Sequence, residues 1–467
     1  MLRGGTSRVE ITPKAGTHLG GTWGRLRKAE TVLEPLHARA VVFASADKSL
    51  CFVSADVVIA TRAWSDRIRK GIKEKTGIPE DAIMVHAPQP HSAPVLGNFI
   101  IDDEFDGIPE EHEYLRGSQR SYNEYAAGRI IEAAAGAYES LRPASIGCGR
   151  AVRDDLAFNR RAVMRDGTVR MPPFSFSSRD LPLGPTDICY MEGPMDPEVG
   201  VFCARDEDLN PVALLLHHTC HPVNVFGLLK GGNVVSPDWV GIWAQAHEGR
   251  RNGEMTAIVL NGCCGNINPW PPFRADYIPD HRYMGTELAD TADKTLMRMT
   301  FDQTDRVDFL SRRIELPLRL PSKEASEEAA RLLDQHPTVL WSEEDPTRAD
   351  NEWMLAAMLR SVELEAARGS SYSYEIQAFR IGDVAFIGLP GEPMVEGQLE
   401  IKVGSPAEFT FVAHGVGDYA GYLAPESSYK RGGHEIRKEP AKWCKLGPGC
   451  LEAVARESVS MLKELFR

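Results

Sequence analysis

The sequence predicts an α/β fold with a mixed β-sheet core and flanking helices. Short apolar runs typical of strands alternate with segments whose apolar residues recur at helical spacing. The strand-like runs end in loops rich in polar residues, an arrangement that is common in α/β enzymes. The chain has 467 residues, 43% of them hydrophobic and 25% charged, so it can bury a large core.

The first third of the chain predicts several strands and two helices. A helix over 63–75 ends at Thr76-Gly77-Ile78-Pro79, because glycine and proline stop helices. The second helix, at 122–138, is rich in alanine with apolar positions at helical spacing. The strands expected here lie at 40–44, 50–53, 57–60 and 82–85.

The rest of the chain repeats this alternation. Ser322 is suited to cap a helix that runs through 333, and a second helix at 352–367 completes a charged pair. We expect this segment, 321–368, to form a helical layer or a lid. Because no repeat or linker is visible, we expect one domain spanning 1–467. The remaining predicted elements are strands at 212–216, 257–260, 376–380, 384–389 and 410–413 and helices at 239–250 and 451–465.

Charge and composition argue against several classes of partner. The formal net charge is -13, which would repel nucleic-acid phosphates and anionic lipids. No apolar stretch approaches the roughly 20 residues that span a bilayer, so no stable membrane insertion is expected. The N-terminus lacks an apolar signal region, which predicts a cytoplasmic protein. Nine cysteines without a C-x-x-C pair suggest buried free thiols, and a homo-oligomer stays open.

Several catalytic signatures are missing, and the remaining candidates are loops at strand ends. The chain has no P-loop, dinucleotide-binding glycine motif or G-x-S-x-G elbow. His217 and His221 have the spacing of helical zinc sites, but the intervening glutamate is missing and Pro222 argues against a helix. On an extended segment, His221 at the strand tip is the best ligand candidate, although these histidines are equally suited to the core. Glu392 follows another apolar strand. A functional role for this carboxylate requires partner residues from elsewhere in the chain.

Read together, these segments resemble the neutral (alkaline, non-lysosomal) ceramidase family through nearly the whole chain, as a divergent short member. The ordered set of motifs is more specific than any one of them. The similar segments are 8–13 (Arg-Val-Glu-Ile-Thr-Pro), the loop at 84–94, Phe158-Asn159-Arg160, Cys220-His221 with 235–238, Leu389-Pro390-Gly391-Glu392, Tyr419-Ala420-Gly421-Tyr422 and Gly433-His434-Glu435. The resemblance implies the family's N-terminal catalytic domain only, because its further C-terminal domain has no counterpart here.

The resemblance implies one Zn²⁺ ion that activates water toward an amide carbonyl. Its ligands in the family are two histidines, a glutamate and a tyrosine, and the matching residues here are His221, Glu392 and Tyr422. Gln89 stands where the family has its first histidine ligand. Three interpretations of Gln89 follow. The site could bind its metal more weakly or prefer a harder ion, His86 or His91 from the same loop could take the place of Gln89 as a ligand, or the site could hold no metal.

Residues around these ligands match the family in part. His91 and Arg160 match residues that hold and polarise the substrate, and His434 replaces a tyrosine but can still move protons near neutral pH. Asn268 stands where the family has a serine, so no serine nucleophile is available there. The weaker candidates for support of the ligands are His218 and Asp238.

These observations lead to one principal hypothesis and two alternatives. The principal hypothesis is a zinc-dependent, amidase-like hydrolase acting on an amide or related acyl bond of a small soluble substrate, with His91, Arg160 and His434 as catalytic residues. One alternative is a carbohydrate-processing hydrolase or lyase, which would pair Glu392 with Asp238 or Asp418. The other is a non-catalytic binding protein whose site has decayed.

Overall fold

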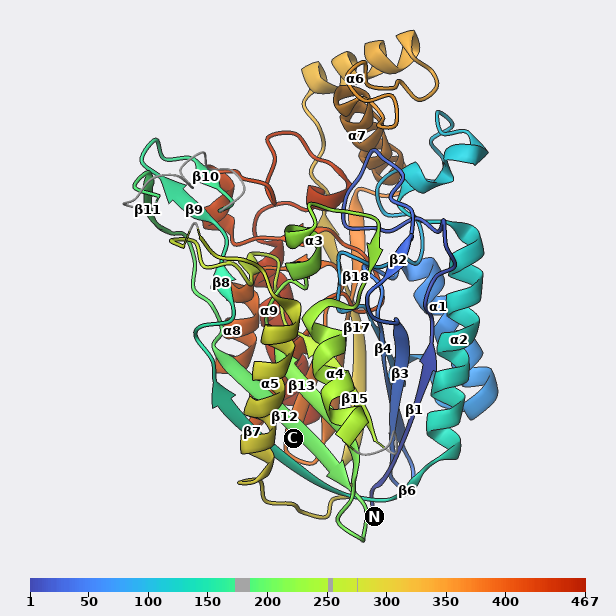
Figure 1. Cartoon of the computed structure of the whole chain (residues 1–467), viewed down its shortest axis with the longest axis vertical. Coiled ribbons are helices and arrows are strands. Elements are labelled where there is room, and N and C mark those ends of the chain that lie inside the picture. The colour runs from blue at the N-terminus through green and yellow to red at the C-terminus, as the bar shows by residue number, and fades with distance from the viewer. Residues whose placement is uncertain (173–184, 251–254, 275) are drawn as a thin grey trace.

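The computed structural model of the chain describes residues 1–172, 185–250, 255–274 and 276–467 and confirms the α/β class. Three large sheets form the interior, and helices cover their outer faces (Figure 1). Each sheet mixes antiparallel strands with one parallel pair at an edge: β4 with β5, β13 with β15, and β19 with β21. These three parallel pairs position the candidate site.

The strands of the three sheets follow the apolar runs in the sequence. The first sheet has the order β5 (Ile83–His86), β4 (Ser49–Ala55), β3 (His37–Ala44), β1 (Arg3–Glu10) and β6 (Arg142–Pro143). The second has the order β15 (Thr256–Asn261), β13 (Pro211–His218), β12 (Glu198–Arg205) and β7 (Ser145–Val152). The third has the order β17 (Val307–Pro317), β18 (Ser371–Ile381), β19 (Val384–Gly388) and β21 (Phe409–Ala413).

Shorter elements complete the chain between these strands. The small strands are β2 (Thr31–Val32), β8 (Phe158–Asn159), β9 (Ala162–Met164), β10 (Val169–Arg170), β11 (Ile188–Met191), β14 (Val234–Val235), β16 (Ile267–Asn268), β20 (Glu392–Pro393) and β22 (Tyr422–Leu423). The 3₁₀ turns are η1 (Glu80–Ala82), η2 (Glu110–Arg116), η4 (Glu426–Lys430) and η5 (Lys442–Cys444).

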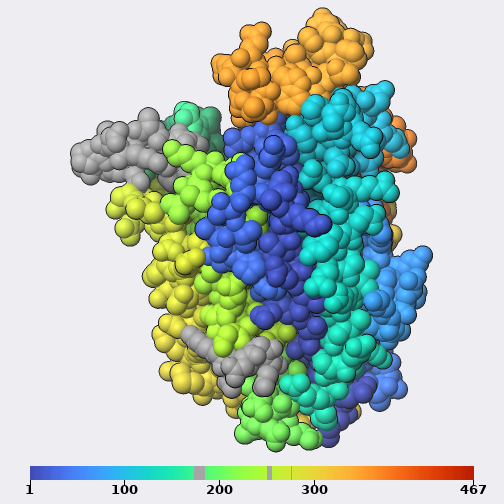
Figure 2. Space-filling view, turned by 45° about the vertical axis from the view of Figure 1, so that its right-hand side comes forward, coloured from blue at the N-terminus to red at the C-terminus, as the bar shows by residue number. Residues whose placement is uncertain are grey.

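Pairs of helices cover the sheets. Helices α1 and α2 pack on the first sheet, α4 and α5 on the second, and α8 and α9 on the third. Helices α6 and α7 form a hairpin that projects from one end of the molecule (Figures 1 and 2). The helices are α1 (Arg62–Thr76), α2 (Arg120–Glu139), α3 (Asn224–Leu228), α4 (Asp238–Arg250), α5 (His281–Leu296), α6 (Lys323–Gln335), α7 (Asn351–Arg368), α8 (Val395–Gly404) and α9 (Cys450–Leu465).

Buried phenylalanines join the three sheets into one core. Phe43 of the first sheet meets Phe202 of the second with ring centroids 5.5 Å apart. Phe386 of the third sheet meets Phe52 of the first at 5.0 Å and Phe202 at 5.5 Å. All these pairs are edge to face, the geometry that aromatic quadrupoles favour. The sheets are therefore held in fixed relative positions, which also fixes the loops at their ends.

Most of the predicted elements are present, with one clear error and several omissions. Ser322 caps α6 by accepting a hydrogen bond from the Ala325 N–H at 3.2 Å, as its sequence position suggests. The predicted strand at 57–60 is wrong: the chain bends there, and Val58 N–H bonds to Pro94 O instead of joining a sheet. The run is buried all the same, and burial alone does not distinguish a strand from a packed loop. Helices α5 and α8 and strands β7, β12 and β17 were not expected from the sequence.

Two further expectations concern cysteines and membrane-spanning segments. The nine cysteines are all free thiols, and seven of them are buried. Within the described ranges, no helix combines the length and the apolar character needed to cross a bilayer.

Candidate active site

The candidate site lies where the three parallel strand pairs end. The loop after β5 carries Gln89 and His91, the loop after β13 carries His221, and the loop after β19 carries Glu392. Strand β20 starts at Glu392 and pairs in parallel with β22, which places Glu392 opposite Tyr422. Carboxyl ends of parallel strands are a common location for ligand sites in α/β proteins.

His221 is held with one ring nitrogen on the backbone and the other facing a carboxylate. Its Nδ1 lies 2.6 Å from Cys264 O and 3.2 Å from Ile267 O, and carbonyl oxygens only accept hydrogen bonds, so Nδ1 carries a proton. Its Nε2 lies 3.2 Å from Glu392 Oε2. Burial, together with the charge of Arg160, lowers the pKa of His221, which favours the neutral ring. Two acceptors then face each other across a gap that a cation would fill.

This gap fits a divalent metal ion in part. Neighbouring ligands of a tetrahedral zinc with bonds of about 2.0 Å lie roughly 3.3 Å apart, close to the 3.2 Å between His221 and Glu392. However, the residues that the structure describes include no group of three or more His, Cys, Asp or Glu side chains suited to a metal. Further ligands would therefore have to be a different kind of donor, such as the Gln89 amide oxygen or the Tyr422 phenol.

Glu392 has additional partners that keep it ionised. Its Oε1 accepts a hydrogen bond from Tyr419 Oη at 2.9 Å. Burial would raise the pKa of Glu392, but the hydrogen bond and charge of His221 when its ring is protonated, then Arg160 and Gln89, lower it well below the usual range. Gln89 has a φ of 74°, in the left-handed region that is costly for a residue with a side chain. Its buried Oε1 finds no hydrogen-bond partner among the described residues.

Arg160 links the candidate ligands to a buried ionic network. It donates to Tyr422 Oη at 3.1 Å, to Asn268 Oδ1 at 3.2 Å and to Glu435 Oε1 at 2.8 Å. Glu435 also accepts a hydrogen bond from Arg161 at 2.6 Å. Burial would raise the pKa of Glu435, but the two arginines lower it to about 2. The charges of Arg160 and Glu435 thus compensate each other, and the Arg160 side chain is fixed in position.

His91 lies beside His221, and His434 lies beside Tyr422. The His91 ring lies 5.6 Å from the His221 ring, and its buried Nε2 is without a hydrogen-bond partner in the described structure. Burial and the charge of His221 lower the pKa of His91 to about 3. His434 is exposed and lies 5.9 Å from Tyr422, between ring centroids. It also stacks on Trp443 at 6.4 Å, and Trp443 itself is buried.

Three weaker candidates from the sequence are engaged elsewhere. His86 contacts Ser54 Oγ at 3.3 Å, and the His218 ring packs edge to face on Trp239 at 5.7 Å. Asp238 accepts hydrogen bonds from the backbone of Val225 and Trp239, each at 2.8 Å.

The second carboxylate that glycoside chemistry would need is also committed elsewhere. Asp418 is held by Arg62 at 2.9 Å and by the Tyr372 hydroxyl. Asp238 is fully buried and bonded to backbone amides, as described above. Asp418 lines a small cavity together with Glu392 and Gln89, but its carboxylate is already bound by Arg62 and Tyr372.

Asn261 organises the loops of the site and was not expected to do so. Its buried side chain donates to Pro88 O and Cys220 O, both at 3.0 Å, and accepts from Cys220 N–H at 3.2 Å. Its carbonyl accepts from His414 N–H at 3.0 Å. Asn261 directly precedes Gly262-Cys263-Cys264 at the end of a predicted strand, and this position is the sequence signal that could have identified it. Tyr419, Arg161 and Glu435 were also given no role from the sequence, because their partners lie far away along the chain.

Comparisons with known proteins identify the fold. No family model and no curated protein sequence matches the chain. Among solved structures, the neutral ceramidase from Pseudomonas aeruginosa is similar, with a TM-score of 0.71 and 17% identity. A ceramidase complexed with C2 has a TM-score of 0.70 and 18% identity, and each likeness covers 100% of this chain and 75% of the other. The chain therefore has the fold of the neutral ceramidases over its whole length.

Proposed function

We propose that the chain is a metal-dependent hydrolase that cleaves an amide or related acyl bond of a small soluble substrate. The observation that carries the proposal is the pairing of His221 Nε2 with Glu392 Oε2 at 3.2 Å, with Nδ1 of the same ring tied to backbone carbonyls. This is how metal-binding histidines are usually oriented, because the second nitrogen fixes the tautomer of the first. The neutral-ceramidase fold supports the same class of reaction.

His221, Glu392 and Tyr422 would hold the ion, with the Gln89 amide oxygen in the fourth position. When bound, a divalent ion supplies a Lewis acid and lowers the pKa of water to near neutrality. Zn²⁺ is the first choice for an imidazole and a carboxylate, while a neutral amide oxygen suits a harder ion better. The identity of the metal is therefore part of the proposal that needs measurement.

The other side chains bind the substrate and move protons. Arg160, fixed by Glu435, would orient the substrate carbonyl beside Tyr422 through charge-assisted hydrogen bonds. The neutral His91 ring would hydrogen bond the same oxygen through Nε2 as negative charge develops. In hydrolysis, water oxygen bonds to the acyl carbon and gives up a proton, the carbon–nitrogen bond breaks, and the amine nitrogen gains a proton. The neutral His434 ring, beside Tyr422, would accept the proton from water and pass it on to the amine nitrogen.

The aromatic side chains next to His434 suggest what the substrate looks like. Trp443 stacks on His434 and also on Trp23, with 6.1 Å between the two indole centroids. His434 is exposed and Trp23 is partly exposed, and aromatic rings that solvent can reach bind apolar or planar groups. We therefore expect the part of the substrate that leaves the site on this side to be apolar or planar.

Metal content of the purified protein tests the proposal first. Protein prepared without a metal-affinity column is compared with His221→Ala and with His336→Ala, which removes an imidazole outside the site. We expect about one metal ion per chain in the wild type and in the His336 variant and none in His221→Ala. A panel of simple amides then tests turnover.

Two results would contradict this proposal. If none of the proteins retains metal after zinc is added, the presence of glutamine at position 89 has abolished metal binding. If His221→Ala retains full amide hydrolysis, the reaction uses other residues. Ligand binding without turnover, or turnover of glycosides alone, would favour the alternatives from the sequence.

A further inference from the structure

Helices α8 and α9 leave a groove between them on the outer side of the third sheet. The two helices lie side by side (Figure 1), and the groove has a volume of about 780 Å³. We call it the α8–α9 groove. Its charged lining residues are Glu396, Glu400, Glu452, Arg456, Lys463 and Arg467. The proposed hydrolase mechanism uses none of these side chains, so an inference from this groove does not depend on it.

Two glycines of α8 bring the helices close together and fix their relative direction. A Cβ at Gly397 would lie 2.5 Å from the Leu451 side chain, and a Cβ at Gly404 would lie 2.7 Å from that of Val459. Helix axes approach each other more closely where the side chains at the contact are small. The starts of α8 and α9 therefore lie at one end of the groove, and their last turns lie toward the other.

The middle of the groove is apolar, and part of it is exposed. Val403, next to Gly404, is 86% exposed, the highest value among the large hydrophobic side chains of the described residues. Val459 and Ala455 continue the apolar lining on α9. A valine as exposed as Val403 gains free energy when another surface covers it.

Charges of opposite sign lie on the two sides of this apolar middle. Toward the helix starts, the lining has three acids and one base, Arg456. Toward the helix ends it has two bases, Lys463 and Arg467, and no acid. In the part of the chain that the structure describes, none of these six side chains takes part in an ion pair. The groove therefore has an acidic half and a basic half whose charges are available to a partner.

Two of these charges are placed symmetrically about the middle of the groove. Glu400 comes four residues before Gly404, and Lys463 comes four residues after Val459. Each therefore lies one helical turn, about 6 Å along the helix, from the contact between Gly404 and Val459. A surface with this arrangement is complementary to a second copy of itself that is turned end to end.

We propose that the chain forms a homodimer through the α8–α9 groove, with a two-fold axis near Val403. The axis sets the acidic half of each groove against the basic half of the other, so Glu400 of each copy faces Lys463 of its partner copy. The two Val403 side chains are covered at the centre. An apolar centre with a charged rim is the usual anatomy of a protein interface.

Sedimentation velocity of the full chain over a range of protein concentrations tests the proposal. Glu400→Lys and Lys463→Glu each set like charges against each other in the dimer, whereas the double variant Glu400→Lys/Lys463→Glu restores opposite charges with the signs exchanged. Val403→Lys brings two cations together at the axis. Val152→Lys is the matched control, because it makes the same change at a valine of β7 that is 71% exposed and lies outside the groove.

We expect the wild type to change from monomer to dimer as its concentration rises. The dissociation constant should rise about tenfold or more in Val403→Lys and in both single charge variants. It should return to within about threefold of the wild type in the double variant and change by less than about twofold in Val152→Lys. All four substituted side chains are exposed, so unfolding temperatures should stay close to that of the wild type.

Three results would overturn the proposal. A wild type that stays monomeric at every concentration would leave the groove to a different partner protein. A dimer that Val403→Lys does not weaken would form through another surface. A double variant that associates as weakly as the single charge variants would show that Glu400 and Lys463 do not face each other.

Discussion

Glu435 is the residue whose removal should best reveal how the site is held. It lies between two buried arginines, at 2.8 Å from Arg160 and 2.6 Å from Arg161, and its side chain is 2% exposed. The pair of arginines lowers its pKa from the ordinary 4.5 to about 2, against the effect of burial. This difference corresponds to about 3 kcal/mol of stability, present above pH 4.5 and lost as the pH falls through about 2.

We therefore expect Glu435→Gln to lower the free energy of unfolding by about 3 kcal/mol near pH 7. The difference from wild type should shrink as the pH falls from about 5 toward about 2, because the wild type then loses the same charge. Urea unfolding followed by tryptophan fluorescence measures both effects. Metal content and amide turnover should also fall, since Arg160 loses its anchor.

Glu365→Gln is the matched control. It removes a buried carboxylate from between Lys442 and Lys445 and should reduce stability while metal content stays unchanged. A loss below about 1 kcal/mol in Glu435→Gln, or a difference from wild type that does not change with pH, would refute the reasoning about this network.

Two further predictions concern the loops that carry the ligands. Gln89→His should tighten zinc binding by about tenfold or more in a chelator competition assay, because imidazole is the better zinc ligand and histidine tolerates a left-handed φ; an unchanged affinity would place residue 89 outside the metal site. Gly391→Ala should cost more than about 2 kcal/mol and weaken zinc binding, because its φ is 73° and a Cβ would lie 2.5 Å from Gly421 O. Gly16→Ala, with a φ of 87° and no atom within 4 Å of its Cβ, should cost only about 1 kcal/mol, and equal losses in the two variants would contradict this account.

The sequence alone predicted the α/β class and most of the elements. Helical spacing and a glycine–proline stop predicted α1 to within one residue at each end, and Ser322 predicted the start of α6. These signals are local: they depend on residues within one or two turns of each other. The strand prediction for 57–60 was wrong because local signals do not report long-range contacts. The conformation of this run depends on a hydrogen bond to Pro94, which lies far along the chain.

His221 was a candidate ligand from its place at the end of a strand, but the full set of candidate ligands could be assembled from the sequence only through the resemblance to a known family. His221, Glu392 and Tyr422 are more than 200 residues apart at the extremes, and no spacing rule connects them. The substitution at Gln89 was visible in the sequence. Its strained φ of 74° and its unpartnered buried oxygen were not.

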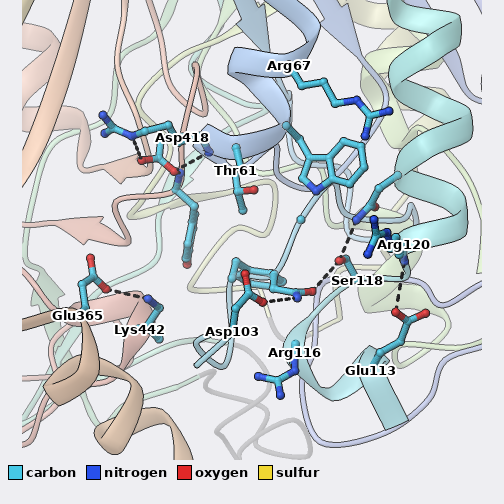
Figure 3. Close-up of a pocket in the computed structure, with 18 of the residues that line it drawn as sticks. Thr61, Arg67, Asp103, Glu113, Arg116, Ser118, Arg120, Glu365, Asp418 and Lys442 are labelled. Atoms are coloured by element: carbon cyan, nitrogen blue, oxygen red, sulfur yellow. Dashed lines mark hydrogen bonds and ion pairs between the residues drawn. The ribbon is translucent and has the colours of Figure 1, made fainter. Parts of the chain in front are cut away.

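The tertiary structure alone decided which polar residues act together. Three parallel strand pairs from three sheets end at one place, and a phenylalanine core fixes the sheets against each other. Only this packing brings Nε2 of His221 against Glu392 and leaves His218 and Asp238 in other surroundings. The large pocket that Tyr419 lines is likewise formed by helix ends and turns that are distant in sequence (Figure 3). Local propensities fix each element, whereas long-range packing determines which side chains meet, and chemistry at a site depends on the latter.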